Sequence, residues 1–259
     1  MTLYLQPKIY RNVKMTRVQI SSDLHLESHP DWVFDSLIRK TGDILVLAGD
    51  IHSLYLLDDY KKFVDHCQSL FDLVVVVFGN NEYYWRERYG APRTMDDLTK
   101  TAVAELSSPS VSVLVDSSIV YEGISIFGGC GWNDMIGCNV NQTTFPIHGV
   151  DVEDVAGLHL SFRKSLTEFL DGKHDKILIV THYCPLQVEC VRNKSYPYDD
   201  DSRRWYCNFS DEIETRNLTW VSGHTHQCHD VFINMSRLVS NQDPHPVGTS
   251  YRADKTIVI

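Results

Sequence analysis

The fold is decided by the stretch RVQISSDLHLE, residues 17–27, in which a short apolar run ends in polar and charged side chains. Arg17–Ser21 has the composition and length of a β-strand. Asp23 and His25 follow two residues apart, so the alternation of side chains along a strand places both on one side of the sheet edge. A carboxylate beside an imidazole suits a borderline divalent metal such as manganese, iron or zinc. Because an Asp-x-His pair also occurs by chance in polar loops, the metal interpretation depends on the rest of the chain.

Four more predicted strands end in side chains that can ligate a metal. Three of them are unbroken apolar runs, which implies burial on both faces, and the fourth is shorter. The strands and the candidate ligands after them are Asp43–Ala48 with Asp50, Leu73–Phe78 with Asn80, Lys176–Val180 with His182, and Leu218–Ser222 with His224 and His226. Because ligand sites of α/β sheets lie at the carboxyl ends of strands, we expect all of these side chains to meet.

Helices alternate with these strands, as in layered α/β proteins. Apolar residues at helical spacing predict helices at Pro30–Lys40, Leu57–Phe71, Asp96–Leu106 and Val155–Leu170.

Short β-branched runs follow the third helix and predict antiparallel hairpin strands, so the sheet should be mixed. These runs are Val111–Val115, Ser118–Tyr121 and Gly123–Phe127. The tail from Val231 on contains strand-like pieces, including Thr256–Ile259, that should close a second sheet. With no linker, repeat or low-complexity tract, we expect residues 1–259 to form one domain. Residues 1–14 precede Met15 as an N-terminal extension, edge strand or arm.

The composition is that of an ordinary globular protein. The chain has 259 residues, of which 43% are hydrophobic and 22% charged, enough for one large core. A net charge of −10 repels phosphate backbones and therefore disfavours binding to nucleic acid. Seven cysteines without Cys-x-x-Cys spacing favour reduced thiols. Because no secretory signal or membrane-spanning run is visible, we expect a cytoplasmic protein that does not bind membranes.

The donor set favours two metals over one. Seven oxygen and nitrogen donors around a central carboxylate are too many for a single tetrahedral ion, but suit two ions bridged by an aspartate. Such a pair, ~3.5–4 Å apart, lowers the pKa of a trapped water from ~15.7 toward ~7 and clamps a phosphoryl group. We therefore predict hydrolysis of phosphoric esters. The donors admit manganese, iron, zinc, nickel or magnesium, and manganese is our first choice.

Taken in order, the motifs resemble those of the calcineurin-like metallophosphoesterases, in particular the compact bacterial and phage members. They are Asp23-x-His25, Gly49-Asp50, Gly79-Asn80-x-Glu82, His182 and Gly223-His224-x-His226. The resemblance implies a four-layer α-β-β-α sandwich of two mixed sheets flanked by helices. It also implies one metal on Asp23, His25 and His226, and another on Asn80, His182 and His224, with Asp50 bridging the two.

One residue departs from the family pattern. The third motif of the family carries a histidine that helps the leaving oxygen, and here Asn81 occupies that position. An amide can donate a hydrogen bond but cannot deliver a proton, and general-acid help is worth ~10²–10⁴ in rate. Three explanations stay open: a substitution introduced to trap a ligand, a substrate with a good leaving group, or a chain that has lost catalysis. The intact ligand set favours the first. His52 is a candidate substitute acid, although we favour a surface or packing role.

Substrate contacts are less clearly marked. Arg203 and Arg204 can bind phosphate oxygens bidentately, and Trp132, Trp205 or Tyr206 can stack on a base. Because the whole chain forms a core domain with short loops, we expect a small phosphodiester or nucleotide-like substrate. The alternatives are a phosphomonoesterase or protein phosphatase, a nuclease, and a catalytically silent protein that sequesters a nucleotide or phosphorylated ligand. The sequence leaves the oligomeric state open.

Overall fold

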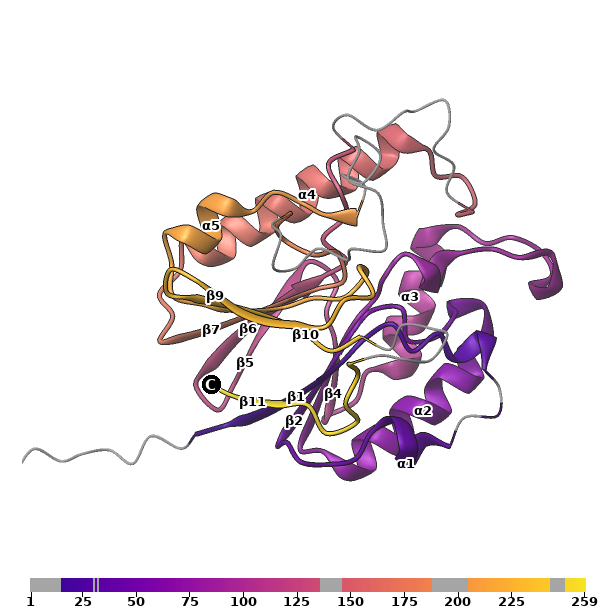
Figure 1. Ribbon diagram of the computed structural model, residues 1–259. Helices are drawn as coiled ribbons and strands as arrows, with labels where there is room; N and C mark the ends of the chain where they lie inside the picture. Colours follow the sequence, from indigo (N-terminus) through magenta and orange to yellow (C-terminus); the bar gives the residue numbers. More distant parts are fainter. Residues whose placement is uncertain (1–14, 30, 32, 136–145, 188–204, 243–249) are drawn as a thin grey trace, which may run out of the picture.

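Two β-sheets face each other in the computed structural model, and helices cover their outer faces (Figure 1). The structure describes residues 15–29, 31, 33–135, 146–187, 205–242 and 250–259. The first sheet contains, in spatial order, β11 (Thr256–Val258), β1 (Arg17–Ser21), β2 (Ile44–Ala48), β3 (Leu73–Val77) and β4 (Val111–Val113). The second contains β5 (Ser117–Tyr121), β6 (Ile124–Gly129), β7 (Lys176–Thr181), β8 (Thr219–Val221), β10 (Ser236–Ser240) and β9 (His229–Ile233). The expected α-β-β-α sandwich of two mixed sheets is confirmed.

The first sheet is parallel except at one edge, where β11 runs antiparallel to β1. Every residue of β2 and β3 is buried, as their unbroken apolar sequences predict. One face of these strands packs under the helices α1 (Phe34–Leu37), α2 (Leu57–Leu70) and α3 (Met95–Leu106), which lie along the outer side of this sheet in Figure 1. The other face turns toward the second sheet.

The second sheet has a parallel centre, with β6, β7, β8 and β10 in register, and antiparallel strands at both edges. Its outer face is covered by α4 (Val152–Leu170) and α5 (Ser210–Glu214). The rings of Phe127 from β6 and Phe162 from α4 meet edge to face at 5.6 Å. No helix among the described residues combines the length and the apolar character needed to cross a bilayer.

An apolar layer joins the two sheets. Alternate residues of β2 and β3, such as Val46 and Val75, meet Val180 of β7 and Val239 of β10 in this layer. Because both sheets bury one face here, their strands are held with their carboxyl ends at a common edge, which sets the position of the candidate site.

Three sequence-based expectations about the elements were wrong. Val111–Val113 is not part of a hairpin but the parallel edge strand of the first sheet, because it follows α3 in a β-α-β crossover. Thr256–Val258 closes the first sheet, not the second, by pairing with β1. Among the described residues, the helix expected over residues 30–40 is limited to Phe34–Leu37, since the chain is already extended at the β-branched Ile38. By contrast, β1 has the predicted bounds, and the hairpin of β5 and β6 forms.

Candidate metal centre

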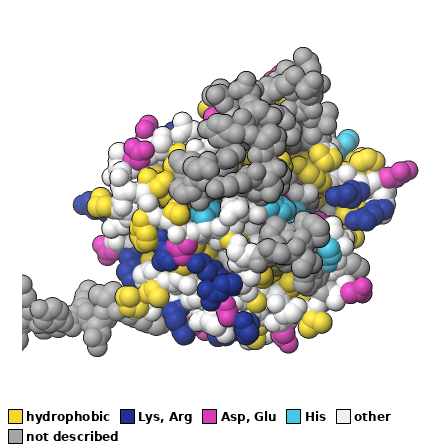
Figure 2. Space-filling view, in the orientation of Figure 1, with side chains coloured by type: hydrophobic (Ala, Val, Ile, Leu, Met, Phe, Trp, Pro, Cys, Tyr) yellow, Lys and Arg dark blue, Asp and Glu magenta, His cyan; other side chains and the backbone are white. Residues whose placement is uncertain are grey.

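The predicted ligands come together at the common edge of the two sheets. Two groups of side chains each have candidate ligand atoms within 4.8 Å of one another: Asp23, His25 and His226, and Asp50, His182 and His224. The members of the second group are all buried, whereas His25 and His226 of the first are partly exposed. Figure 2 shows histidine side chains at the surface across the middle of this face. One group is therefore more accessible to solvent than the other.

His182 stands at the centre of the buried group. Its Nε2 lies 3.3 Å from Asp50 Oδ2, 3.1 Å from His224 Nδ1 and 3.0 Å from the side-chain oxygen of Asn80. Its Nδ1 lies 3.1 Å from the Ala48 carbonyl, which can only accept a hydrogen bond. The proton of a neutral His182 therefore sits on Nδ1, and the lone pair of Nε2 is left for a metal.

The partly exposed group is arranged around two rings. The imidazoles of His25 and His226 stack with centroids 5.5 Å apart. His226 Nε2 lies 3.6 Å from Asp23 Oδ1, and His25 Nε2 lies 3.7 Å from Asp50 Oδ2. The same oxygen of Asp50 thus faces a histidine of each group, which is the position that a bridging ligand needs.

The backbone at this site is strained. Five candidate ligands have φ values between +46° and +71°: Asp23, His25, Asp50, His224 and His226. Only nine described residues other than glycine have positive φ, so more than half of them lie here. Left-handed backbone of this kind costs of order 1–3 kcal/mol per residue and clusters at functional sites. Strand alternation was therefore the wrong reason for expecting Asp23 and His25 to lie on one side, because their backbone is left-handed. His224 and His226 belong to different ligand groups.

Two glycines of the motifs make room for the ligands. A Cβ on Gly49, whose φ is +83°, would lie 2.6 Å from His182 Nδ1. A Cβ on Gly79 would overlap Asp50 Oδ1. Any larger residue at either position would push the loops after β2 and β3 away from His182.

Glu82 holds the first-sheet loops together. Its buried carboxylate accepts hydrogen bonds from the backbone N–H groups of Asp50 and Ile51 at 2.8 Å each and of Gly79 at 2.9 Å. Burial and the neighbouring Asp50 carboxylate raise the pKa of Glu82 to about 8, and His182 and the N–H of Ile51 act in the opposite direction. Sequence reasoning placed Glu82 in a motif but did not recognise this positioning role.

Two further supporting residues were missed. Gln242, after β10, accepts a hydrogen bond from the His226 N–H at 2.5 Å. Glu27 Oε1 lies 3.4 Å from His25 Nδ1, and this contact turns Nε2 of the ring toward Asp50. The sequence pattern Asp-x-His-x-Glu could have identified Glu27, whereas no local sequence pattern marks Gln242.

The electrostatics favour a cation. Burial opposes protonation of His182, but the Asp50 carboxylate outweighs it and raises the pKa to about 9. Burial likewise opposes protonation of His25, and the Glu27 and Asp50 carboxylates raise its pKa to about 9. Burial and the neighbouring His182 lower the pKa of His224. Buried carboxylates that hold positive charge beside imidazole and amide donors are a donor set that fits divalent metals.

Asn81 lies against the candidate bridging residue. Its backbone N–H donates to Asp50 Oδ1 at 2.9 Å, and its side-chain amide donates to Asp50 Oδ2 at 2.6 Å. His52 is buried, and its ring stacks on Tyr60 with centroids 6.0 Å apart. This agrees with the packing role that we favoured for His52.

The predicted substrate contacts have different surroundings. Trp132 and Tyr206 are 3% and 4% exposed, and the ring of Trp132 packs against Tyr183 at 5.7 Å. Trp205 is partly exposed and its ring centroid lies 5.0 Å from that of His224, so it stands beside the buried group. Arg203 and Arg204 lie outside the described residues.

Comparison with known proteins places this arrangement in a family. The sequence profile of the calcineurin-like phosphoesterases matches residues 16–228, which contain all of the candidate ligands. The chain belongs to the calcineurin-like phosphoesterase family. Family membership makes it a phosphoesterase-type hydrolase.

Two relatives cover nearly the whole length of this calcineurin-like phosphoesterase. An uncharacterized protein of Acanthamoeba polyphaga mimivirus is 21% identical over 85% of this chain and 88% of its own. Phosphopantetheinyl hydrolase from Mycobacterium tuberculosis has a similar fold, with a TM-score of 0.68, 18% identity, and coverage of 90% of this chain and 89% of its own. A putative 5'-nucleotidase from Staphylococcus aureus matches less well, with a TM-score of 0.45 and 13% identity over 87% of this chain and 48% of its own.

Proposed function

We propose that the chain hydrolyses a small phosphodiester or nucleotide-like phosphoric ester with the help of two divalent metal ions, manganese being the first candidate. The observation that carries the proposal is the position of Asp50. Its Oδ2 lies 3.3 Å from His182 Nε2 and 3.7 Å from His25 Nε2, between the two groups of candidate ligands. A carboxylate in this position can serve two ions at once.

The chain offers a complete ligand set for each ion. Asp23, His25 and His226 would hold one, and Asn80, His182 and His224 the other, with Asp50 shared. When bound, such a pair supplies Lewis acidity and a water of lowered pKa. Glu82 and Glu27 orient these ligands, because Glu82 anchors the backbone at Asp50 and Glu27 contacts Nδ1 of His25.

Asn81 limits the acid chemistry of this site. Its amide can donate a hydrogen bond to an oxygen, but it has no proton to give to a departing alkoxide. We therefore expect weakened activity on esters with poor leaving groups. The same residue favours the second candidate, a protein that binds a nucleotide or phosphorylated ligand without hydrolysing it.

The variant Asn81→His tests both candidates. On an alkyl phosphodiester with manganese, we expect turnover to rise by ~10²–10⁴, and by less on bis(p-nitrophenyl) phosphate, whose leaving group needs no acid. The matched control is Asn217→His, which makes the same exchange at an exposed position after α5 and should change nothing. Metal content is measured for each protein. Tight ligand binding without turnover in either form would support the binding protein and contradict the hydrolase.

A further inference from the structure

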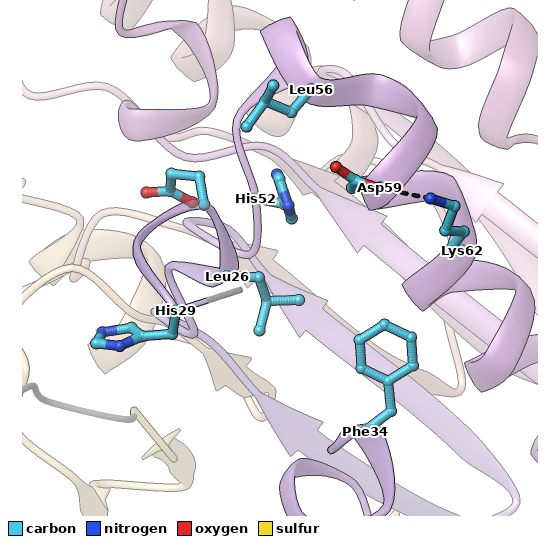
Figure 3. Close-up of a pocket in the computed structure, with 8 residues that line it drawn as sticks. Leu26, His29, Phe34, His52, Leu56, Asp59 and Lys62 are labelled. Atoms are coloured by element: carbon cyan, nitrogen blue, oxygen red, sulfur yellow. Dashed lines mark hydrogen bonds and ion pairs between the residues drawn. The ribbon is translucent and has the colours of Figure 1, made fainter. Parts of the chain in front are cut away.

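A pocket of about 400 Å³ lies next to the candidate metal centre (Figure 3). It opens between the 3₁₀ turn Leu26–Ser28, the short helix α1 and the start of α2. Leu26 and Phe34 line its apolar part, and His52 lies between Leu26 and Leu56 in Figure 3. This volume is large enough for a small organic group.

The pocket is connected to the candidate metal centre through two of its lining residues. Glu27 faces the pocket and also contacts His25 Nδ1 at 3.4 Å. His52, another lining residue, follows Asp50 by two positions. Glu27 therefore belongs both to the wall of the pocket and to the surroundings of His25, so the pocket begins beside this candidate ligand.

The polar groups of the pocket leave one carboxylate with spare hydrogen-bonding capacity. The Glu27 side chain is 5% exposed, and within the described part of the chain its carboxylate has no hydrogen bond or ion pair other than the contact with His25. At the exposed rim, by contrast, Lys62 Nζ lies 2.7 Å from Asp59 Oδ1, so these two charges compensate each other. A carboxylate in the pocket wall with a single partner among the described residues favours a ligand that brings a positive charge and hydrogen-bond donors.

The neighbouring apolar groups suit the carbon chain of such a ligand. Leu26 is 5% exposed and lines the pocket, and Phe34 offers an aromatic face that also attracts cations. We propose that this pocket binds a substrate arm that carries a protonated amine on a short apolar chain, with Glu27 as the counter-charge. This inference rests on the proposed function.

The test uses two probes that differ by one amine. Propyl phosphate and 3-aminopropyl phosphate are titrated calorimetrically into the full chain loaded with manganese, with inorganic phosphate as the reference. We expect the amine to tighten binding about tenfold, as a charge-assisted hydrogen bond does. Glu27→Gln should abolish the difference between the probes. Glu105→Gln, the same exchange on the exposed side of α3, should preserve it.

A second variant tests the space itself. Leu56→Trp fills the pocket and should weaken 3-aminopropyl phosphate while leaving inorganic phosphate unchanged. Equal affinity of the native chain for both probes, or a preference that survives Glu27→Gln, would overturn the pocket assignment and leave the proposed function intact. If inorganic phosphate itself does not bind the manganese form, both the proposed function and the pocket assignment fail.

Discussion

The two sheets contribute different chemistry to the candidate metal centre. Strand ends of the first sheet carry all of its oxygen donors, Asp23, Asp50 and Asn80, together with His25, whereas strand ends of the second carry only imidazoles, those of His182, His224 and His226. Each group of ligands takes members from both sheets. Metal binding and the packing of the two sheets should therefore stabilise each other, because neither sheet holds a complete site.

The sheets also differ in how their loops are anchored. In the first, the buried carboxylate of Glu82 accepts three backbone N–H groups. In the second, the neutral amide of Gln242 accepts from the His226 N–H and donates to Thr225 Oγ1 and the Gln227 carbonyl. Because Glu82 holds three backbone N–H groups of two loops whereas Gln242 holds a single backbone N–H, the first-sheet loops should be the more firmly held.

Metal removal should cause the largest change in the free energy of unfolding, because each ion is held by ligands from both sheets. Manganese at 100 times its dissociation constant should stabilise the chain by ~2.7 kcal/mol for each ion, and a chelator should remove the whole gain. Asp50→Asn, which alters the shared ligand, should lose most of it, whereas His25→Ala should lose about half. Urea unfolding with and without manganese measures these differences. If all three proteins gain equally, the ligand groups do not share Asp50.

Loss of the first-sheet anchor comes next. Glu82→Ala leaves three buried N–H groups without their acceptor, at ~1–3 kcal/mol each, so we expect at least about 3 kcal/mol of destabilisation even in the metal-free chain. Urea unfolding of the metal-free protein is the measurement, with the exposed Glu105→Ala as the control. A loss below about 1 kcal/mol would mean that other groups hold these loops.

A fall in pH should destabilise the second sheet. Burial lowers the pKa of His229, on β9, to about 4, and its Nε2 is buried without a partner among the described residues. The unfolded chain, whose imidazole titrates near 6.5, therefore takes up the proton first as the pH falls. Stability is fully present above about pH 6.5 and is lost toward pH 4, with ~2 kcal/mol lost between pH 7 and 5.

The variant His229→Phe isolates this contribution, since Gln227, whose carbonyl faces Nδ1 of the ring, keeps hydrogen bonds from Ser240 and Gln242. In metal-free protein, unfolding free energies of the native chain should fall by ~2 kcal/mol more than those of the variant between pH 7 and 5. Hydrogen exchange should locate the weakening in β9 and β10. Equal pH dependence of the two proteins would contradict the assignment.

Prediction from sequence worked best where burial is complete. The runs at Asp43–Ala48 and Leu73–Phe78 became β2 and β3 almost residue for residue, because a strand covered on both faces has to be apolar throughout. It failed for short strands whose residues are compatible with either of the two sheets. The strands Val111–Val113 and Thr256–Val258 are short and rich in β-branched residues, which suit any sheet. Only the strands beside them decide which sheet they join and in which direction they run.

The sequence by itself determined the type of donor and its place after each strand, since ligand chemistry depends on residue identity and strand ends are marked by the change from apolar to polar. Tertiary structure decided how those donors meet. The left-handed backbone at Asp23 and His224, the sharing of Asp50 and the support from Gln242 all depend on two sheets packed face to face. The physical reason is that such contacts join residues far apart in the chain, and their energies exist only once the apolar layer between the sheets has formed.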